Sequence, residues 1–159
     1  MQQFIKLYEK KGDIQETEKW ANQLLQYSEE FNFDIGKIQG LIANGNIKMQ
    51  LGSLEEAQKY YEEASQLSIK IGDIATQGQI IMNLGRVNLS FGKLDESLDL
   101  FQQALKIWVI TDNKSGEAEA LVYKCEVLKS LGNLSKSLNS YERILAIFRE
   151  AGDKGGKII

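Results

Sequence analysis

The sequence predicts an all-α solenoid, in which antiparallel helix pairs stack side by side in one row. Glycine recurs at a spacing of 40 residues, at Gly12, Gly52, Gly92 and Gly132. Between these glycines, apolar residues recur every three or four positions, which is the spacing of an amphipathic helix and not the alternation of a strand. The sequence has no proline, so glycine and small polar residues must separate the helices.

Other residues repeat in phase with these glycines. Five residues after each glycine stands a small or short side chain: Thr17, Ala57, Ser97 and Ser137. Nine residues after three of the glycines stands an aromatic side chain: Tyr61, Phe101 and Tyr141. The first repeat is the exception and has Ala21 at this position. A further column lies seven residues before each glycine and contains Ile5, Gly45, Gly85 and Cys125. Another lies twenty residues after each glycine and contains Asn32, Gly72, Asp112 and Gly152. Several columns in phase over four copies indicate an internal repeat, which decides the fold.

The repeats follow one another along the chain. Residues 1–32 form a partial repeat, because Met1 to Lys11 supplies only the later part of a first helix. Residues 33–72, 73–112 and 113–152 form complete repeats. Residues 153–159 are the start of a further repeat, because Gly152 to Ile159 lines up with Asp112 to Glu119.

The repeat at residues 73–112 shows the two-helix unit most clearly. Apolar side chains at helical spacing predict a first helix over roughly Ile74 to Phe91 and a second over roughly Leu94 to Ile110. Gly92 can adopt the left-handed conformation that ends the first helix. Gly72-Asp73 and Asp112-Asn113 provide a stop, a turn and an N-cap between repeats. Because these connections are short, neighbouring helices must pack antiparallel.

Both ends of the sequence fall inside a repeat, and exposed ends of a solenoid need polar capping. We therefore expect the chain to be part of a longer array. The alternative is a short natural protein whose truncated terminal repeats associate with another copy.

The composition excludes several classes of function. The chain has 159 residues, a formal charge of −3, one cysteine and no histidine. This charge gives no support for nucleic-acid binding. The lack of histidine excludes an imidazole-based catalytic site, and one cysteine without any histidine cannot form a structural zinc site. The sequence also lacks a membrane-spanning apolar run and a signal peptide. We expect a cytoplasmic protein without catalytic residues, metal, cofactor, nucleic-acid partner or membrane partner.

The repeat resembles the tetratricopeptide repeat. The residues that carry the resemblance are Asn83-Leu84-Gly85, Phe91 to Ser97 and Phe101 to Leu105. The unit is longer than the common length of about 34 residues and is similar to the 40-residue variant of G-protein-signalling adaptors and bacterial signalling arrays. HEAT repeats have a similar length, but the fixed glycine turn, the spacing from Phe101 to Ala104 and the lack of proline favour the tetratricopeptide repeat. The resemblance implies a right-handed α-solenoid.

The resemblance also implies a concave groove lined by the first helices, which is where this fold binds its ligands. The family's groove positions correspond to these candidate residues for peptide or partner binding: Gln39, Ile42, Asn46, Met49, Gln79, Met82, Asn83, Arg86, Glu119, Tyr123 and Glu126. The partial first helix adds Lys6, Glu9 and Lys10.

Asn46 and Asn83 are the sharpest of these candidates. An asparagine amide can donate to and accept from a peptide backbone at once, although an exposed helical asparagine can equally have no role. The family's carboxylate clamp needs basic residues where this chain has Glu119 and Tyr123, which argues against an acidic chaperone tail as ligand. A mixed-charge peptide with an apolar anchor fits the pattern better.

Two other residues favour packing over function. Trp108 shares its column with Phe148, which favours packing between repeats. Cys125 lies where two other repeats have glycine, so a small buried side chain is expected there and not a nucleophile.

The sequence therefore predicts a protein-interaction scaffold that binds a peptide or protein segment in its groove, and not an enzyme. Two alternatives remain open. The chain could be the sensor or regulatory arm of a larger signalling protein, or a self-assembling structural array.

Overall fold

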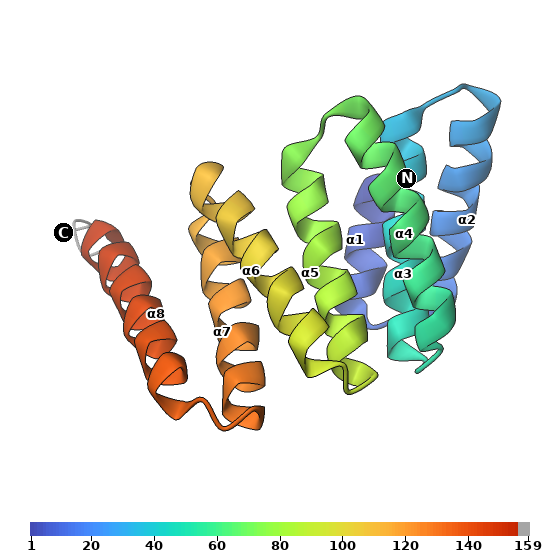
Figure 1. Cartoon of the computed structure of the whole chain (residues 1–159). Coiled ribbons are helices and arrows are strands. Elements are labelled where there is room, and N and C mark those ends of the chain that lie inside the picture. Colours follow the sequence, from blue (N-terminus) through green and yellow to red (C-terminus); the bar gives the residue numbers. More distant parts are fainter. Residues whose placement is uncertain (156–159) are drawn as a thin grey trace.

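The computed structural model describes residues 1–155 as a row of helices joined by short turns (Figure 1). The helices in this range are α1 (Gln2–Lys11), α2 (Ile14–Glu30), α3 (Asp34–Gln50), α4 (Leu54–Ile71), α5 (Ile74–Ser90), α6 (Leu94–Ile110), α7 (Lys114–Ser130) and α8 (Leu134–Gly155).

Each helix packs against the helices before and after it in the chain, from α1 to α8. The odd-numbered helices are the first helices of the repeats and the even-numbered helices are the second. Two pairs of first helices, α1 with α3 and α5 with α7, also contact each other directly. The fold is an all-α superhelix of antiparallel helix pairs, which confirms the predicted fold class.

The turns lie where the glycine spacing predicts them. Gly12, Gly52, Gly92 and Gly132 all have φ between 71° and 76°, the left-handed region that glycine enters without steric cost. Between repeats the left-handed residue is Asn32, Gly72 or Asp112. The N-caps also form as predicted, because Asp73 accepts a hydrogen bond from the backbone N–H of Thr76 and Asn113 accepts one from that of Gly116.

The two helices of a repeat cross where a small residue faces a large one. A Cβ atom on Gly45 would lie 2.5 Å from the Tyr61 ring, and one on Gly85 would lie 2.7 Å from the Phe101 ring. In the first repeat the sizes are reversed, because Ile5 and Ala21 are packed in one core cluster. The reversal explains why Ala21 departs from its aromatic column.

The C-terminal end differs from the prediction. The sequence predicts a turn at Gly152-Asp153-Lys154, whereas α8 continues to Gly155. Each residue added to a helix gains a hydrogen bond, and within the described part of the chain no following helix packs against α8 to favour a turn. The rest of the predicted further repeat, residues 156–159, lies outside the described residues.

Candidate functional site

The first helices line a surface depression made of two adjoining cavities. We call these two cavities together the groove. The larger cavity, of about 350 Å³, is lined from α1, α3, α5 and α7, and also by Trp108 of α6. The smaller, of about 140 Å³, lies between α1, α3 and α5 and shares Glu9, Asn46 and Gln79 with the larger one. The groove therefore runs across successive repeats and does not lie within one of them.

Most of the predicted groove residues line one of these cavities. Those from α3, α5 and α7 are Gln39, Ile42, Asn46, Met49, Gln79, Met82, Asn83, Arg86 and Glu119. Tyr123 and Glu126 line neither cavity. Tyr123 instead stacks on Phe101, with ring centroids 5.1 Å apart, and Glu126 is exposed on α7. A binding role for any of these side chains stays a prediction.

A chain of hydrogen bonds crosses the groove from α1 to α5. Asn46 Nδ2 donates to Glu9 Oε1 over 3.1 Å. Asn46 Oδ1 accepts from the Tyr61 hydroxyl at 2.8 Å and from Asn83 Nδ2 at 3.5 Å. Arg86 Nη1 then donates to Asn83 Oδ1 over 3.3 Å. These contacts hold the two asparagine side chains in fixed positions.

The chain of hydrogen bonds changes what the two asparagines can offer a ligand. The sequence suggested amides free to donate and accept together, but both amide oxygens already accept from protein donors. Each Nδ2 has two N–H groups and uses one of them here. The asparagines therefore offer the groove donors in preference to acceptors.

Tyr61 keeps the Asn46 amide in this orientation. Its ring is buried beneath Gly45, and burial raises the pKa of the phenol well above its usual range, with Arg86 opposing and Glu9 adding to the effect. Tyr61 is therefore a neutral hydrogen-bond donor at physiological pH. The Glu9 carboxylate can only accept, so the nitrogen of Asn46 faces Glu9 and its oxygen accepts the hydrogen bond from Tyr61.

The groove exposes fewer apolar side chains than the sequence suggests. Ile42 and Met82 are buried within core clusters, whereas Met49 is only partly buried. Trp108 extends from α6 between Gly78 of α5 and Gly116 of α7, where added Cβ atoms would lie within 3 Å of its ring. The indole thus packs between repeats, as predicted, and also lines the groove. The sequence signal for this was the pair of glycines on the flanking first helices.

The charges of the groove alternate along its length. Lys6 and Glu9 lie on α1, Arg86 lies on α5, and Glu119 lies on α7. The Arg86 guanidinium lies 5.9 Å from the centroid of the Tyr123 ring, a cation–π contact that helps to fix its position. One basic side chain therefore lies between acidic ones in the larger cavity.

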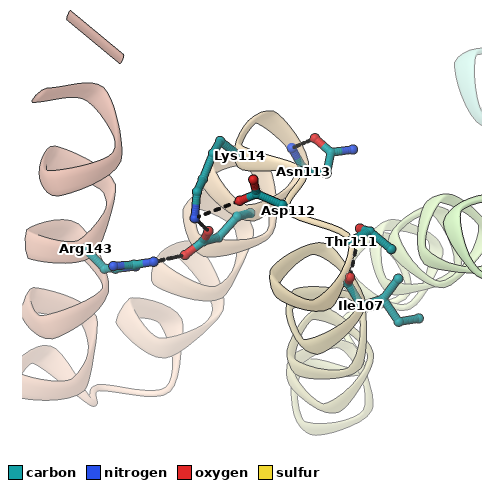
Figure 2. Close-up of polar contacts among 8 residues, drawn as sticks. Ile107, Thr111, Asp112, Asn113, Lys114 and Arg143 are labelled. Atoms are coloured by element: carbon teal, nitrogen blue, oxygen red, sulfur yellow. Dashed lines mark hydrogen bonds and ion pairs between the residues drawn. The ribbon is translucent and has the colours of Figure 1, made fainter. Parts of the chain in front are cut away.

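A buried carboxylate that the sequence did not indicate lies outside the groove and binds Lys114 of α7 and Arg143 of α8, which are labelled in Figure 2. Glu117 is only 1% exposed. Its Oε1 accepts from Arg143 Nε at 2.8 Å, and its Oε2 accepts from Lys114 Nζ at 3.1 Å. Burial alone would raise the pKa of Glu117, but hydrogen bonds from Arg143 and Lys114 outweigh burial and hold the pKa below its usual range. The carboxylate is ionised and joins the two helices of the last complete repeat.

Residues 34–108, from the start of α3 into α6, match the sequence model of the tetratricopeptide repeat. This part of the chain consists of tetratricopeptide repeats. The predicted family is thus confirmed, and the tetratricopeptide array matches none of the curated proteins.

Several solved structures share the fold of this tetratricopeptide array. The apo form of RapI is 14% identical, with a TM-score of 0.85 over 96% of this chain and 56% of RapI. A Rap protein complexed with competence and sporulation factor is 15% identical, with a TM-score of 0.87 over 94% of this chain and 42% of that protein. Aspartyl phosphate phosphatase F from Bacillus subtilis is 16% identical, with a TM-score of 0.86 over 95% of this chain and 40% of the phosphatase. The array therefore spans about half the length of these structures or less, and at such identities the likeness concerns the fold.

No helix within residues 1–155 is both long enough and apolar enough to cross a membrane.

Proposed function

We propose that this chain is a protein-interaction scaffold that binds an extended peptide segment in the groove. The observation that supports this most strongly is the larger cavity, where amides, a basic side chain and acidic side chains from four successive first helices converge. A groove that spans several repeats suits a ligand that is itself extended. The Rap protein structure with competence and sporulation factor is a complex of the same fold.

The groove chemistry specifies the kind of peptide. The remaining N–H groups of Asn46 and Asn83 suit peptide carbonyl oxygens, which accept hydrogen bonds. Arg86 suits an acidic side chain of the ligand, and Glu9 and Glu119 suit basic ones on either side of it. Met49 is an adaptable contact for one apolar side chain. The ligand is thus a mixed-charge peptide in which basic residues flank an acidic one.

We also propose that the chain itself is not an enzyme and works in the cytoplasm. The lone cysteine, Cys125, is buried, and burial raises the pKa of its thiol, so its reactive thiolate is disfavoured. The lack of histidine removes the commonest general base. A second candidate is the regulatory arm of a larger signalling protein, for which groove binding would be the input. Its support is the complex of a Rap protein with a factor.

The test is selection of peptides from a random displayed library on the wild-type chain, followed by affinity measurement with the selected peptides. Arg86→Glu should weaken binding at least tenfold, because it places a negative charge opposite the acidic residue of the peptide. Lys106→Glu is the matched control, since it makes the same charge change at an exposed position of α6. Equal affinities of the two variants, or no enriched peptide, would contradict the proposal. Circular dichroism would establish that both variants are folded.

A further inference from the structure

The last helix exposes an apolar stripe along its length, which we call the α8 stripe. Its residues recur at intervals of three and four, so they share one face of the helix: Leu134, Leu138, Tyr141, Leu145 and Phe148. Each is between 49% and 67% exposed. Contiguous apolar surface of this kind marks an interaction site in a soluble chain.

The same positions one repeat earlier are covered. Forty residues before the α8 stripe, α6 carries Leu94, Leu98, Phe101, Leu105 and Trp108. All five belong to one core cluster that includes Ala120, Tyr123 and Val127 of α7. The repeat therefore uses this face of a second helix to hold the first helix of the next repeat. In α8 the face is complete and has no such helix against it within the described residues.

The opposite end of the row exposes the complementary face. Leu7 on α1 is 43% exposed, whereas its counterparts Val87 and Val127 are fully buried. Val87 packs in a cluster with Ala57, Tyr61 and Ala64 of the preceding second helix, and Val127 packs in a cluster with residues of α6. Leu7 thus occupies the position through which a first helix contacts the second helix before it. In Figure 1, α8 lies at the left end of the row, and α1 lies beyond α5 and away from α8.

We propose that copies of this chain associate head to tail, with the α8 stripe of one copy packed against the α1 face around Leu7 of the next. The contact continues the repeat interface already present between α6 and α7, so it needs no new geometry. The two faces differ, so each copy offers one of each kind. Such a heterologous contact adds copies in a row and is not limited to a pair.

The test uses two variants that each remove one face. Leu7→Glu places a carboxylate where the repeat buries an aliphatic side chain, which is costly without a partner. Leu138→Glu with Leu145→Glu does the same to the α8 stripe. Light scattering coupled to gel filtration should show that the wild-type chain grows beyond twice its 17.9 kDa mass as its concentration rises. Each variant alone should remain at 17.9 kDa.

Mixing the two variants distinguishes a head-to-tail contact from any other. The Leu7 variant keeps the α8 stripe and the α8 variant keeps the α1 face, so an equimolar mixture has one intact contact. It should therefore form a heterodimer of twice the 17.9 kDa mass and grow no further. A Leu7→Glu variant that dimerises by itself would show a tail-to-tail contact and overturn the proposal. A wild-type chain that stays monomeric at high concentration would also overturn it.

Matched controls place the same charges where the repeat leaves side chains exposed. Ser135→Glu with Asn139→Glu adds two carboxylates to α8 at the counterparts of Asp95 and Asp99, which are exposed although α6 has neighbours on both sides. Lys10→Glu is the corresponding control on α1, since Gln50, Ser90 and Ser130 are exposed at that position in the other repeats. Both controls should associate as the wild-type chain does, and loss of association in both would overturn the proposal. Circular dichroism would establish that every variant is folded.

Discussion

At the scale of single residues, the repeat is held in register by pairs of small and large side chains. Gly85 faces Phe101, Gly45 faces Tyr61, and Ile5 with Ala21 makes the same contact with the sizes reversed. The sequence shows that small residues recur at one position of the repeat and large residues at another. It does not show that the side chains at these two positions contact each other. In the sequence, Ile5 and Ala21 each differ in size from the residues at the same position of the other repeats. Only the structure shows that the large Ile5 packs with the small Ala21, so that the two differences offset each other.

Gly85→Ala tests this pairing. An added Cβ would lie 2.7 Å from the ring of Phe101, which is fully buried and cannot move away. Overpacking of this kind costs about 1–3 kcal/mol, although alanine is the better helix former by about 1 kcal/mol. We expect the free energy of unfolding, measured by urea denaturation, to fall.

The second-site control for Gly85→Ala is Phe101→Leu. The double variant should lose less unfolding free energy than the sum of the losses of the two single variants, because the smaller side chain leaves room for the added methyl group. An unfolding free energy of Gly85→Ala equal to or above that of the wild-type chain would contradict the proposed crossing contact.

Glu117 shows a residue-scale feature that the repeat pattern partly encodes. In the first complete repeat, the counterparts of Glu117 and Arg143 are Lys37 and Glu63, whose charged atoms lie 3.5 Å apart. The two columns thus hold an ion pair twice, with the signs exchanged. This exchange was a sequence signal for their contact, but burial of the carboxylate depends on the packing of α8 and could not be predicted.

Glu117→Gln should lower the free energy of unfolding at neutral pH by roughly 1–2 kcal/mol, because a charged hydrogen bond is replaced by a neutral one and the half-exposed Arg143 regains water. The folded-state pKa of Glu117 lies below its unfolded value. Its contribution is therefore complete above the unfolded pKa of about 4.3 and is lost as the pH falls through the folded pKa.

The measurement for Glu117 is urea denaturation of both proteins from pH 7 down to pH 3. The difference between wild type and Glu117→Gln should shrink below about pH 4.3. A difference that does not change with pH, or that grows in acid, would show that the carboxylate is not held ionised by its partners.

At the scale of helices, the sequence predicted most boundaries because each depends on local chemistry. A left-handed residue ends each helix at Gly12, Gly52, Gly72, Gly92 and Gly132, and an N-cap begins the next at Asp73 and Asn113. The end of α8 could not be predicted in the same way. A turn at Gly152 has the right residues, but a turn also depends on a following helix that packs against the last one.

Asn113→Ala should destabilise the chain by about 1 kcal/mol, because the backbone N–H of Gly116 loses its capping oxygen. Ser53→Ala is a matched control at the start of α4, where the side chain makes no capping hydrogen bond. Thermal unfolding should show a lower midpoint for Asn113→Ala than for Ser53→Ala. Equal midpoints would indicate that this cap contributes nothing to stability.

At the scale of the whole molecule, the repeat determines where the groove forms. Successive first helices place Asn46, Asn83 and Glu119 along one groove, and their alignment follows from the 40-residue period and could be predicted. The hydrogen bonds that fix the asparagine oxygens could not, because they join α1, α3, α4 and α5 in three dimensions. Trp108 was missed as a groove residue for the same reason, since it reaches the groove from a second helix.

The groove as a peptide site is the central claim, and locating a bound peptide tests it most directly. The measurement is NMR chemical-shift mapping of the isotope-labelled chain with a library-selected peptide. We predict that the largest amide and side-chain shifts fall on α3 and α5, at Asn46, Asn83 and Arg86. Largest shifts on the outer faces of α4 and α6, or along the α8 stripe, would contradict a groove-binding scaffold.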